Sequence, residues 1–230
     1  KLNQTKYFIK QHGCRNGFEK IHTNEAVQIK ISDRYLTWGW KSKNKKIIPF
    51  HSLLLSRIKD GYKFLNAKKI VFCQNVYPTY FNHIDGGPIL FEDKIYSTLL
   101  CNQVFEKLNK NLRDTFIMRY LKDSNYKYRP YHSYLINSKI EKDVGKKKLQ
   151  NLFKYTRIFI HDQDSTSFLE TLSANIPTFL VLKKSYLDSK RPSIKNYYLD
   201  LEKTNIIFTN SSKLSDFINL NYSTIDKWWH

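Results

Sequence analysis

The sequence predicts an α/β fold, in which a Rossmann-like parallel sheet has helices on both faces. From about residue 68 onward, apolar stretches of strand length alternate with stretches whose apolar residues recur at helical spacing. That alternation is typical of a parallel sheet covered on both sides. The clearest unit spans residues 157–182 and contains a strand, a hydroxyl-rich turn, a helix and a second strand. Ligands of such sheets bind beyond the carboxyl ends of the strands, so the turn after Ile160 is a candidate site.

The helix of this unit lies in the segment DSTSFLETLSANIPTF, residues 164–179. Apolar residues between Phe168 and Leu172 recur at helical spacing and predict one buried face. Asn175 is expected to end the helix, and the next strand is expected at residues 178–182.

Three hydroxyl residues, Ser165, Thr166 and Ser167, are expected to open this helix. The unpaired N–H groups and the partial positive charge of a helix start suit a phosphate. Glu170, one turn further along, is placed to reach sugar hydroxyls beside that phosphate. Ser and Thr are also ordinary cap residues, and Ser167 with Glu170 fits a capping box, so capping alone is the alternative.

Further elements follow the same alternation. We expect strands at residues 29–38, 69–74, 115–120 and 206–208. We expect helices at residues 93–109, 147–153, 191–201 and 214–220. Loops are expected at residues 78–88 and 126–134, and Trp228 and Trp229 are expected to pack a helix against its neighbours.

The formal net charge of +19 over 230 residues narrows the choice of partners. Such a charge fits nucleic acid, an anionic membrane surface or phosphorylated substrates. The lysines are spread along the chain, apart from short runs such as residues 146–148. A generally basic surface is therefore favoured over a dedicated nucleic-acid surface, and we expect no nucleic-acid partner.

Three cysteines, Cys14, Cys73 and Cys101, are far apart and form no C-x-x-C pair. This spacing argues against a disulfide framework or a zinc knuckle and fits a reducing cytoplasm. No apolar stretch is long enough for a membrane span, and no signal peptide is visible. His161 and Asp162 lack further metal ligands at suitable spacing, so no bound metal is expected.

Five segments in a fixed order carry a family resemblance: QHG, ISDRYLTWGW, FIMRY, DSTSFLETLSANIPTF and a terminal KWW. Together they resemble the sugar transferases of bacterial surface-carbohydrate clusters, which make O-antigen (the outer part of lipopolysaccharide) and capsule. Those proteins are similar to GT-B glycosyltransferases, including the β-Kdo transferases and the glycerophosphate polymerases of teichoic acid synthesis. The likeness covers nearly the whole chain, and its specific parts are ISDRYLTWGW and STSFLETLSANIPT.

The resemblance implies two Rossmann-like lobes with a nucleotide-activated donor between them. Residues 1–40 then correspond to the tail of the N-terminal lobe, residues 41–66 to a connector, and residues 67–230 to the donor-binding lobe. A CMP- or CDP-linked sugar is the implied donor, with no tightly bound cofactor. The implied acceptor is a surface glycan or glycolipid, at the cytoplasmic face of an anionic membrane on which the basic protein lies peripherally.

The resemblance also assigns donor-binding residues. Arg119, in the FIMRY segment, and the hydroxyls of Ser165, Thr166 and Ser167 match positions that hold the donor phosphate. Glu170 matches the acidic residue that GT-B enzymes use on the ribose. Arg119 ends an apolar strand, where an unpaired charge is costly, so its partner is either the donor phosphate or a structural carboxylate.

The catalytic assignments rest on the QHG segment. In this family type the His-Gly after a strand faces the cleft, and here that pair is His12 and Gly13. An unperturbed histidine pKa of ~6.5 makes His12 the best candidate base. Glu25 and Asp33 flank the same turn and are candidates for the catalytic carboxylate, although each also fits a helix cap or a surface charge.

Two other interpretations stay open. The family prefers a glycine-rich turn after QHG, whereas Cys14 and Arg15 stand here, and their bulk obstructs close approach of a ligand to the backbone. Most of the first lobe is also missing from these residues, so the chain also fits a non-catalytic remnant that binds a nucleotide sugar without turnover. A basic RNA-binding protein is the third interpretation.

Overall fold

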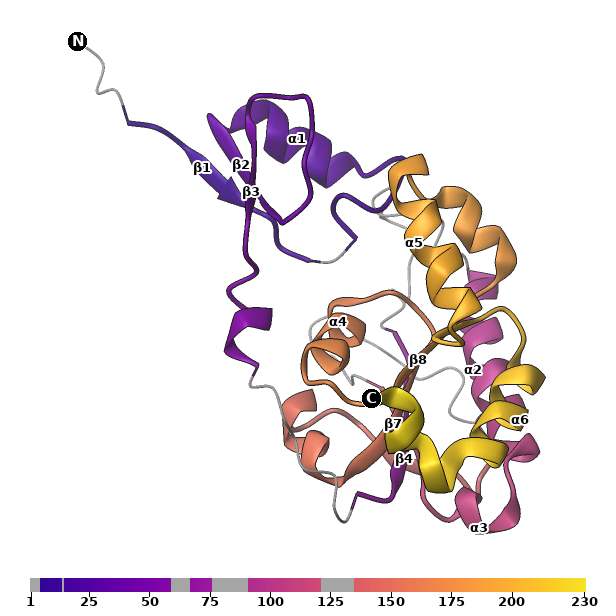
Figure 1. The fold of residues 1–230 in the computed structure, drawn as a ribbon. Coiled ribbons are helices and arrows are strands. Elements are labelled where there is room, and N and C mark those ends of the chain that lie inside the picture. The colour runs from indigo at the N-terminus through magenta and orange to yellow at the C-terminus, as the bar shows by residue number, and fades with distance from the viewer. Residues whose placement is uncertain (1–4, 14, 59–66, 76–90, 121–134) are drawn as a thin grey trace.

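The computed structural model describes residues 5–13, 15–58, 67–75, 91–120 and 135–230. In these residues the strands form one six-stranded sheet and one three-stranded sheet, here called the large and the small sheet (Figure 1). The loops expected at residues 78–88 and 126–134, and Cys14, lie outside the described residues.

The large sheet is wholly parallel in its described pairings. Its strands are β4 (Lys69–Cys73), β5 (Phe116–Arg119), β6 (Glu141–Asp143), β7 (Thr156–His161), β8 (Thr178–Val181) and β9 (Ile207–Phe208). Their order across the sheet is β6-β5-β4-β7-β8-β9, so the first strand in sequence lies at the centre and the chain builds outward on both sides. This is the strand order of a Rossmann fold, and it confirms the predicted fold class.

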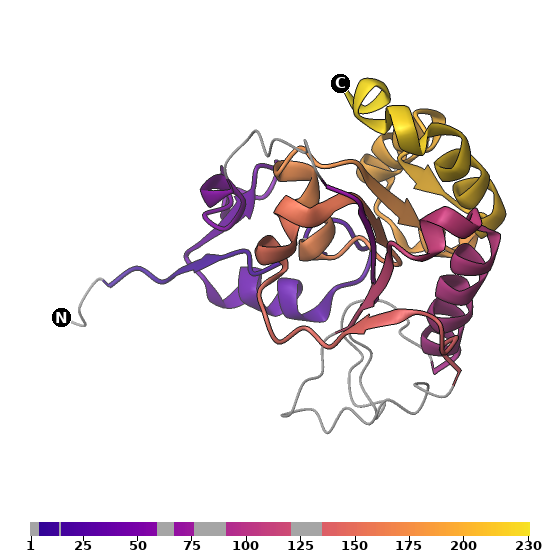
Figure 2. The same cartoon turned by 90° about the horizontal axis from the view of Figure 1, so that it is seen from below.

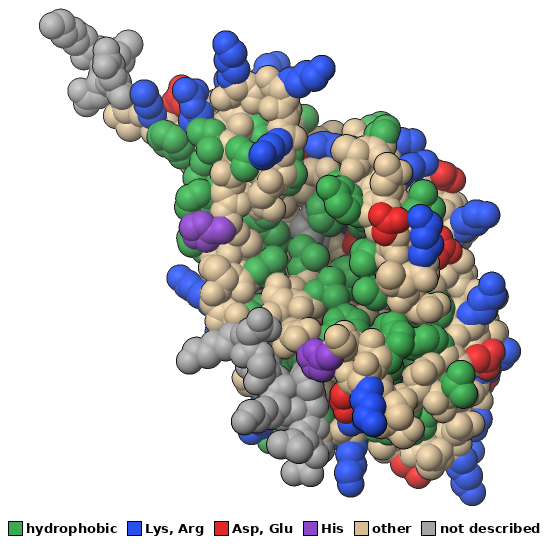
Figure 3. Space-filling model, in the orientation of Figure 1, with side chains coloured by type: hydrophobic (Ala, Val, Ile, Leu, Met, Phe, Trp, Pro, Cys, Tyr) green, Lys and Arg blue, Asp and Glu red, His purple; other side chains and the backbone are tan. Residues whose placement is uncertain are grey.

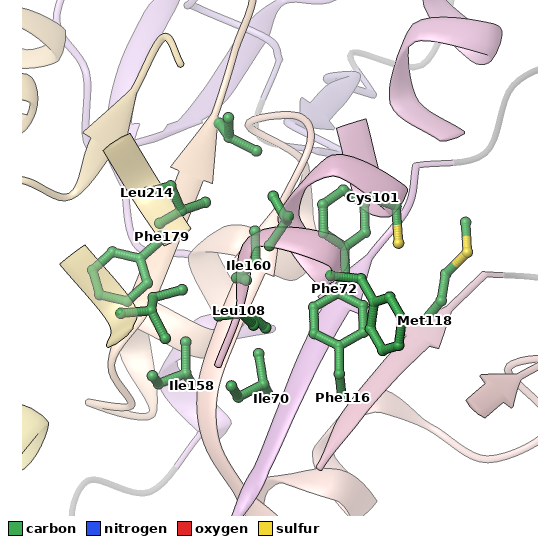
Figure 4. Packing of buried hydrophobic residues seen from close by; sticks show 14 of the residues in the cluster. Ile70, Phe72, Cys101, Leu108, Phe116, Met118, Ile158, Ile160, Phe179 and Leu214 are labelled. Atoms are coloured by element: carbon green, nitrogen blue, oxygen red, sulfur yellow. The ribbon is translucent and has the colours of Figure 1, made fainter. Parts of the chain in front are cut away.

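Helices cover both faces of the large sheet, because the side chains of each strand alternate between two apolar clusters. On β4, Ile70 and Phe72 face one side, while Val71 and Cys73 face the other. The first side packs against α2 (Phe91–Lys107), α6 (Ser211–Asn221) and α7 (Ile225–Trp229), and Figure 4 shows part of this core. The second side packs against the 3-10 helix η2 (Leu149–Tyr155) and α4 (Thr166–Ser173), and α5 (Pro192–Lys203) extends the cover toward β9.

Seen from below, α2 and α6 lie on one side of the large sheet, and α4 lies on the side nearer the N-terminal segment (Figure 2). The short helix α3 (Lys110–Arg113) joins α2 to β5. The C-terminal tryptophans pack as expected. The Trp228 ring lies 4.9 Å from that of Phe217, and Trp229 Nε1 donates to Asn175 Oδ1 at 2.8 Å.

The small sheet contains β1 (Phe8–Lys10), β2 (Arg34–Trp38) and β3 (Ile47–Phe50), which pair in parallel and in that order. The helix α1 (Thr23–Ile31) connects β1 to β2. The strand expected at residues 29–38 is therefore wrong in its first part, because residues 29–31 belong to α1. A histidine begins this helix: His22 Nδ1 accepts from the Glu25 amide at 3.1 Å, which is not one of the usual capping patterns. β3 lies within residues 41–66, where a connector was expected.

Two local expectations in the large sheet are also corrected. The helix α4 begins at Thr166 with Ser165 as its N-cap, and no side chain caps it, so the capping box of Ser167 and Glu170 is wrong. The helix expected at residues 147–153 is the 3-10 helix η2, which spans Leu149–Tyr155. The remaining expected strands and helices are present, with ends displaced by a few residues.

Charged groups join the small sheet to the segment before α5. Lys190 is fully buried, and its Nζ lies 2.7 Å from a carboxylate oxygen of Glu19 and 2.7 Å from one of Asp164. Arg191 Nη2 lies 3.0 Å from Glu25 Oε1. Glu19 and Lys190 also form an isolated antiparallel β-bridge. The turn after β1 is therefore held against the residues that precede α4 and α5.

Candidate functional site

A cavity of about 950 Å³ opens at the carboxyl ends of the central strands. Its walls include Gln74 and Asn75 after β4, Tyr120 after β5, lysines 146–148 after β6, and Ser165, Thr166 and Ser167 after β7. Between β4 and β7 the strand order reverses, and connections leave the sheet in opposite directions. In open α/β sheets this reversal point is where ligands bind.

The start of α4 forms one wall of this cavity. Ser165, Thr166 and Ser167 are half-buried, and the first two serve as N-cap and first helical residue. Ser165 Oγ lies 2.6 Å from Ser167 Oγ. Helix starts leave their first N–H groups without an intrahelical acceptor, so amide donors accompany the hydroxyls here. The predicted hydroxyl cluster thus lines the cavity in the part of the chain that the structure describes.

Arg119 occupies the end of β5 and lines the same cavity. Its Nη1 forms an ion pair with Asp143, and its Nη2 donates to the Lys147 carbonyl at 2.6 Å. Gly145, at φ +69°, donates its amide to Asp143 Oδ1 at 2.9 Å. Of the two partners that the sequence left open, the structure pairs Arg119 with the structural carboxylate. The same contacts brace the loop that carries lysines 146–148.

Cations predominate around the cavity: Arg57, Arg119, Lys146, Lys147 and Lys148 line it. Among the described residues of its lining, Glu170 is the one carboxylate. Burial raises the pKa of Glu170 above its ordinary value. Gln150 Nε2 donates to Glu170 Oε2 at 3.4 Å and orients the carboxylate. The cavity therefore suits an anionic ligand, with one acidic group available for hydroxyl donors.

The QHG turn faces the start of α4. A Cβ placed on Gly13 would lie 3.4 Å from Thr166 Oγ1, so the turn passes close to the hydroxyl cluster. His12, one residue earlier, is exposed. The buried Gln11 shapes this turn, because its Nε2 donates to the Gly13 carbonyl at 2.7 Å and its Oε1 accepts from Trp40 Nε1 at 2.9 Å. The structure thus brings Gly13 close to Thr166, whereas neither His12 nor Gly13 is among the residues that line the cavity.

The two candidate carboxylates lie elsewhere. Glu25 is buried, accepts from the Gly17 amide at 2.8 Å and pairs with Arg191. Asp33 is exposed and accepts from the Tyr7 amide at 2.6 Å. Neither lines the cavity. Both residues have structural partners, and their catalytic role stays a prediction.

Several residues of the site were not predicted. Gln11 Oε1 accepts from the Trp38 amide and from Trp40 Nε1, which lie 27 and 29 positions further along the chain in the ISDRYLTWGW segment. No local sequence pattern predicts contacts over such a separation. The lysine run at residues 146–148 is visible in the sequence, but only the order of the strands places it beside α4. In the described parts of the chain, no three His, Cys, Asp or Glu side chains are grouped to hold a metal ion. No described helix combines the length and apolarity needed to cross a bilayer.

Fold and site together define an α/β protein of Rossmann-like topology. Its cavity lies where the strand order of the sheet reverses, and the residues that line it suit an anionic ligand. A family model described as "LIC12162 family transferase" matches residues 2–230. The chain belongs to this family, and its membership indicates a transferase. No curated protein matches the chain.

Proposed function

We propose that the protein is the donor-binding part of a GT-B-like glycosyltransferase. In this proposal the enzyme transfers a sugar from a cytidine nucleotide donor, CMP- or CDP-linked, to a bacterial surface glycan. The observation that supports this most is the cavity at the sheet reversal, with the start of α4 on one wall and a lysine loop among its other walls. A transferase needs groups that stabilise negative charge on the departing phosphate. Amide donors, hydroxyls and cations supply them here.

In this proposal Ser165, Thr166 and Ser167 hold the phosphate nearest the helix, and Glu170 accepts hydrogen bonds from the ribose. Arg119 is given a supporting role beside them. Because its guanidinium is already bonded to Asp143 and to the Lys147 carbonyl, it holds the lysine loop in place and adds positive charge to the wall.

His12 is the proposed base. Its turn lies against α4 through Gly13, and the proposal places the acceptor between this turn and the donor. Positive charge over the surface, as Figure 3 shows for one face, would assist peripheral binding to anionic lipid at the cytoplasmic face of the membrane.

A second candidate is a nucleotide-sugar-binding protein without turnover. The exposure of His12 and the structural contacts of Glu25 and Asp33 favour it, because no described carboxylate beside His12 is left to orient it. Binding would then persist while transfer is absent.

Calorimetry with CMP and CDP tests the donor site, and we expect binding of at least one of them. Release of nucleotide from CMP- and CDP-sugars, measured with a glycan acceptor, then separates transferase from binding protein. If CMP or CDP binds but release of nucleotide from the activated sugars stays at background, the second candidate is supported. Absence of cytidine-nucleotide binding, together with tight and strongly salt-dependent RNA binding, would refute the proposal in favour of an RNA-binding protein.

A further inference from the structure

His161 lies directly behind the hydroxyl cluster but outside the cavity lining. It is the last residue of β7 and is only 1 % exposed. Its ring lies 5.7 Å from that of Phe168 and 6.1 Å from that of Phe159. Burial lowers the pKa of His161 from its ordinary value of 6.5 to about 3, so the imidazole is neutral at the pH of a cell. A neutral imidazole has one donor and one acceptor nitrogen.

The hydrogen bonds of Thr171 determine which nitrogen is which. Thr171 Oγ1 donates its single proton to the Phe168 carbonyl at 2.9 Å. Its contact of 3.1 Å with His161 Nε2 must therefore take its proton from the histidine. The imidazole is thus protonated at Nε2, and Nδ1 is an acceptor. Ser167 Oγ, 3.4 Å from Nδ1, is the hydroxyl placed to donate to it in a long hydrogen bond.

This assignment orders the hydroxyls at the cavity wall. Because the Ser167 proton is directed to His161, the proton in the 2.6 Å contact between Ser165 and Ser167 comes from Ser165. Ser165 is then the residue whose proton can turn to a bound phosphate without breaking the bond to the histidine. A chain of hydrogen bonds thus connects the buried Thr171, through His161 and Ser167, to Ser165 at the cavity.

We propose that His161 is a positioning residue for the ligand phosphate, acting through Ser167 on Ser165. The inference rests on the proposed donor site. His161 touches no ligand and contributes no charge; by accepting from Ser167 it fixes the direction of that hydroxyl before the phosphate arrives and leaves the Ser165 proton to turn to the phosphate. Such preorganisation strengthens binding because the free site loses less side-chain freedom when it is occupied.

Two substitutions of His161 separate this role from a general packing role. In His161→Asn the side-chain amide lies near the place of Nδ1, so its oxygen can accept from Ser167. In His161→Gln the amide lies near the place of Nε2, so it keeps the contact with Thr171 and loses the one with Ser167. Both variants are of similar polarity, and their stabilities are compared by urea unfolding.

Calorimetric titration with CDP gives the decisive comparison. We expect His161→Gln to bind CDP about tenfold more weakly than the wild type, and His161→Asn to stay within about twofold. Two results would overturn this inference without touching the proposed function. One is equal CDP affinity in His161→Gln and the wild type, and the other is a loss of CDP affinity in both variants that follows their loss of stability. If the wild type binds neither CMP nor CDP, the proposed function fails, and this inference fails with it.

A double-substitution cycle and a spectroscopic measurement add independent readouts. Ser167→Ala should weaken CDP binding at least as much as His161→Gln does, and adding His161→Gln to Ser167→Ala should cause no further loss, whereas additive losses would contradict the chain. The imidazole ¹⁵N chemical shifts of the wild type, recorded without ligand, should show a protonated Nε2 and an unprotonated Nδ1. A protonated Nδ1 would overturn the assignment even if a His161 variant failed to fold.

Discussion

Lys190 and Glu19 form a fully buried ion pair, with 2.7 Å between Nζ and a carboxylate oxygen, although 171 residues separate them in the sequence. The same ammonium group lies 2.7 Å from Asp164, the residue before the hydroxyl cluster. Tyr186 adds a hydrogen bond of 2.8 Å to Asp164. Lys190 thus connects the turn after β1 to the residues that lead into α4.

Replacing Lys190 with Met should destabilise the protein strongly. The substitution keeps the length of the side chain but removes the ammonium group from the buried Glu19 and Asp164 and leaves Glu19 with the longer contact of 3.6 Å to Arg15; breaking a buried pair costs about 3–5 kcal/mol. Urea unfolding measures the loss. Lys195→Met is the matched control, because Lys195 pairs with Asp188 at 3.4 Å on the surface, where such pairs contribute about 0–1 kcal/mol. Similar stabilities of the two variants would contradict the role given to Lys190.

Gly17 should tolerate alanine less well than Gly39 does. Both glycines have positive φ, +84° and +95°, so both alanine variants bear backbone strain. A Cβ on Gly17 would lie 2.4 Å from Trp40 Nε1, whereas a Cβ on Gly39 meets nothing within 4 Å. We expect Gly17→Ala to lose about 1–3 kcal/mol more than Gly39→Ala in unfolding experiments, as overpacking does. Equal losses would mean that Trp40 moves aside freely.

His161 should make the stability depend on pH below neutrality. Its folded pKa of about 3 lies below the ordinary 6.5, so between these values the unfolded chain binds a proton that the folded protein does not. The contribution of the neutral His161 to the free energy of unfolding is complete above pH 6.5. It is lost at roughly 1.4 kcal/mol per pH unit as the pH falls from 6.5 toward 3. Urea unfolding of wild type and His161→Gln at several pH values isolates it. A difference between the two that stays constant with pH would show that His161 is not buried as a neutral group.

Glu170 should discriminate ribose from sugars that lack hydroxyls. If its carboxylate accepts from the ribose, the wild type will prefer CDP to 2′,3′-dideoxy-CDP by about tenfold, and Glu170→Gln will reduce that preference to about twofold. Glu202→Gln on α5, away from the cavity lining, serves as the control and should keep the wild-type preference. Unchanged discrimination in Glu170→Gln would remove Glu170 from the ribose site.

The large sheet could be predicted because its strands are continuous apolar runs between helices of clear periodicity. The unit around Ile160 shows this best, since both strands and the helix between them are confirmed. The segment at residues 29–38 was less clear, because β-branched residues at 27, 29 and 31 resemble a strand and the helix start at His22 has no usual cap. In the structure Val27 and Ile31 are exposed and the one buried side chain of α1 is that of Glu25, so no apolar face marks this helix in the sequence.

The site was predictable only where local chemistry marks it. Ser165, Thr166 and Ser167 stand out as hydroxyls at a helix start, and the structure opens them to the cavity. The contacts of Lys190 and Gln11 depend on segments that the sequence does not relate. Glu25 illustrates the converse: it flanks the turn in sequence, but it is buried against Arg191.

The central claim is that a phosphate group docks at the start of α4, and two variants of Ser165 test it most directly. Asn and Asp are equally good N-cap residues and differ here chiefly by one negative charge, so both should preserve the helix. Calorimetry should give Ser165→Asn a loss of CDP affinity of about tenfold, the loss expected when the hydroxyl contact is removed. Ser165→Asp should bind more than about a hundredfold more weakly than the wild type, because its carboxylate also repels the phosphate. CDP binding of the same strength in Ser165→Asp and Ser165→Asn would show that the phosphate lies elsewhere.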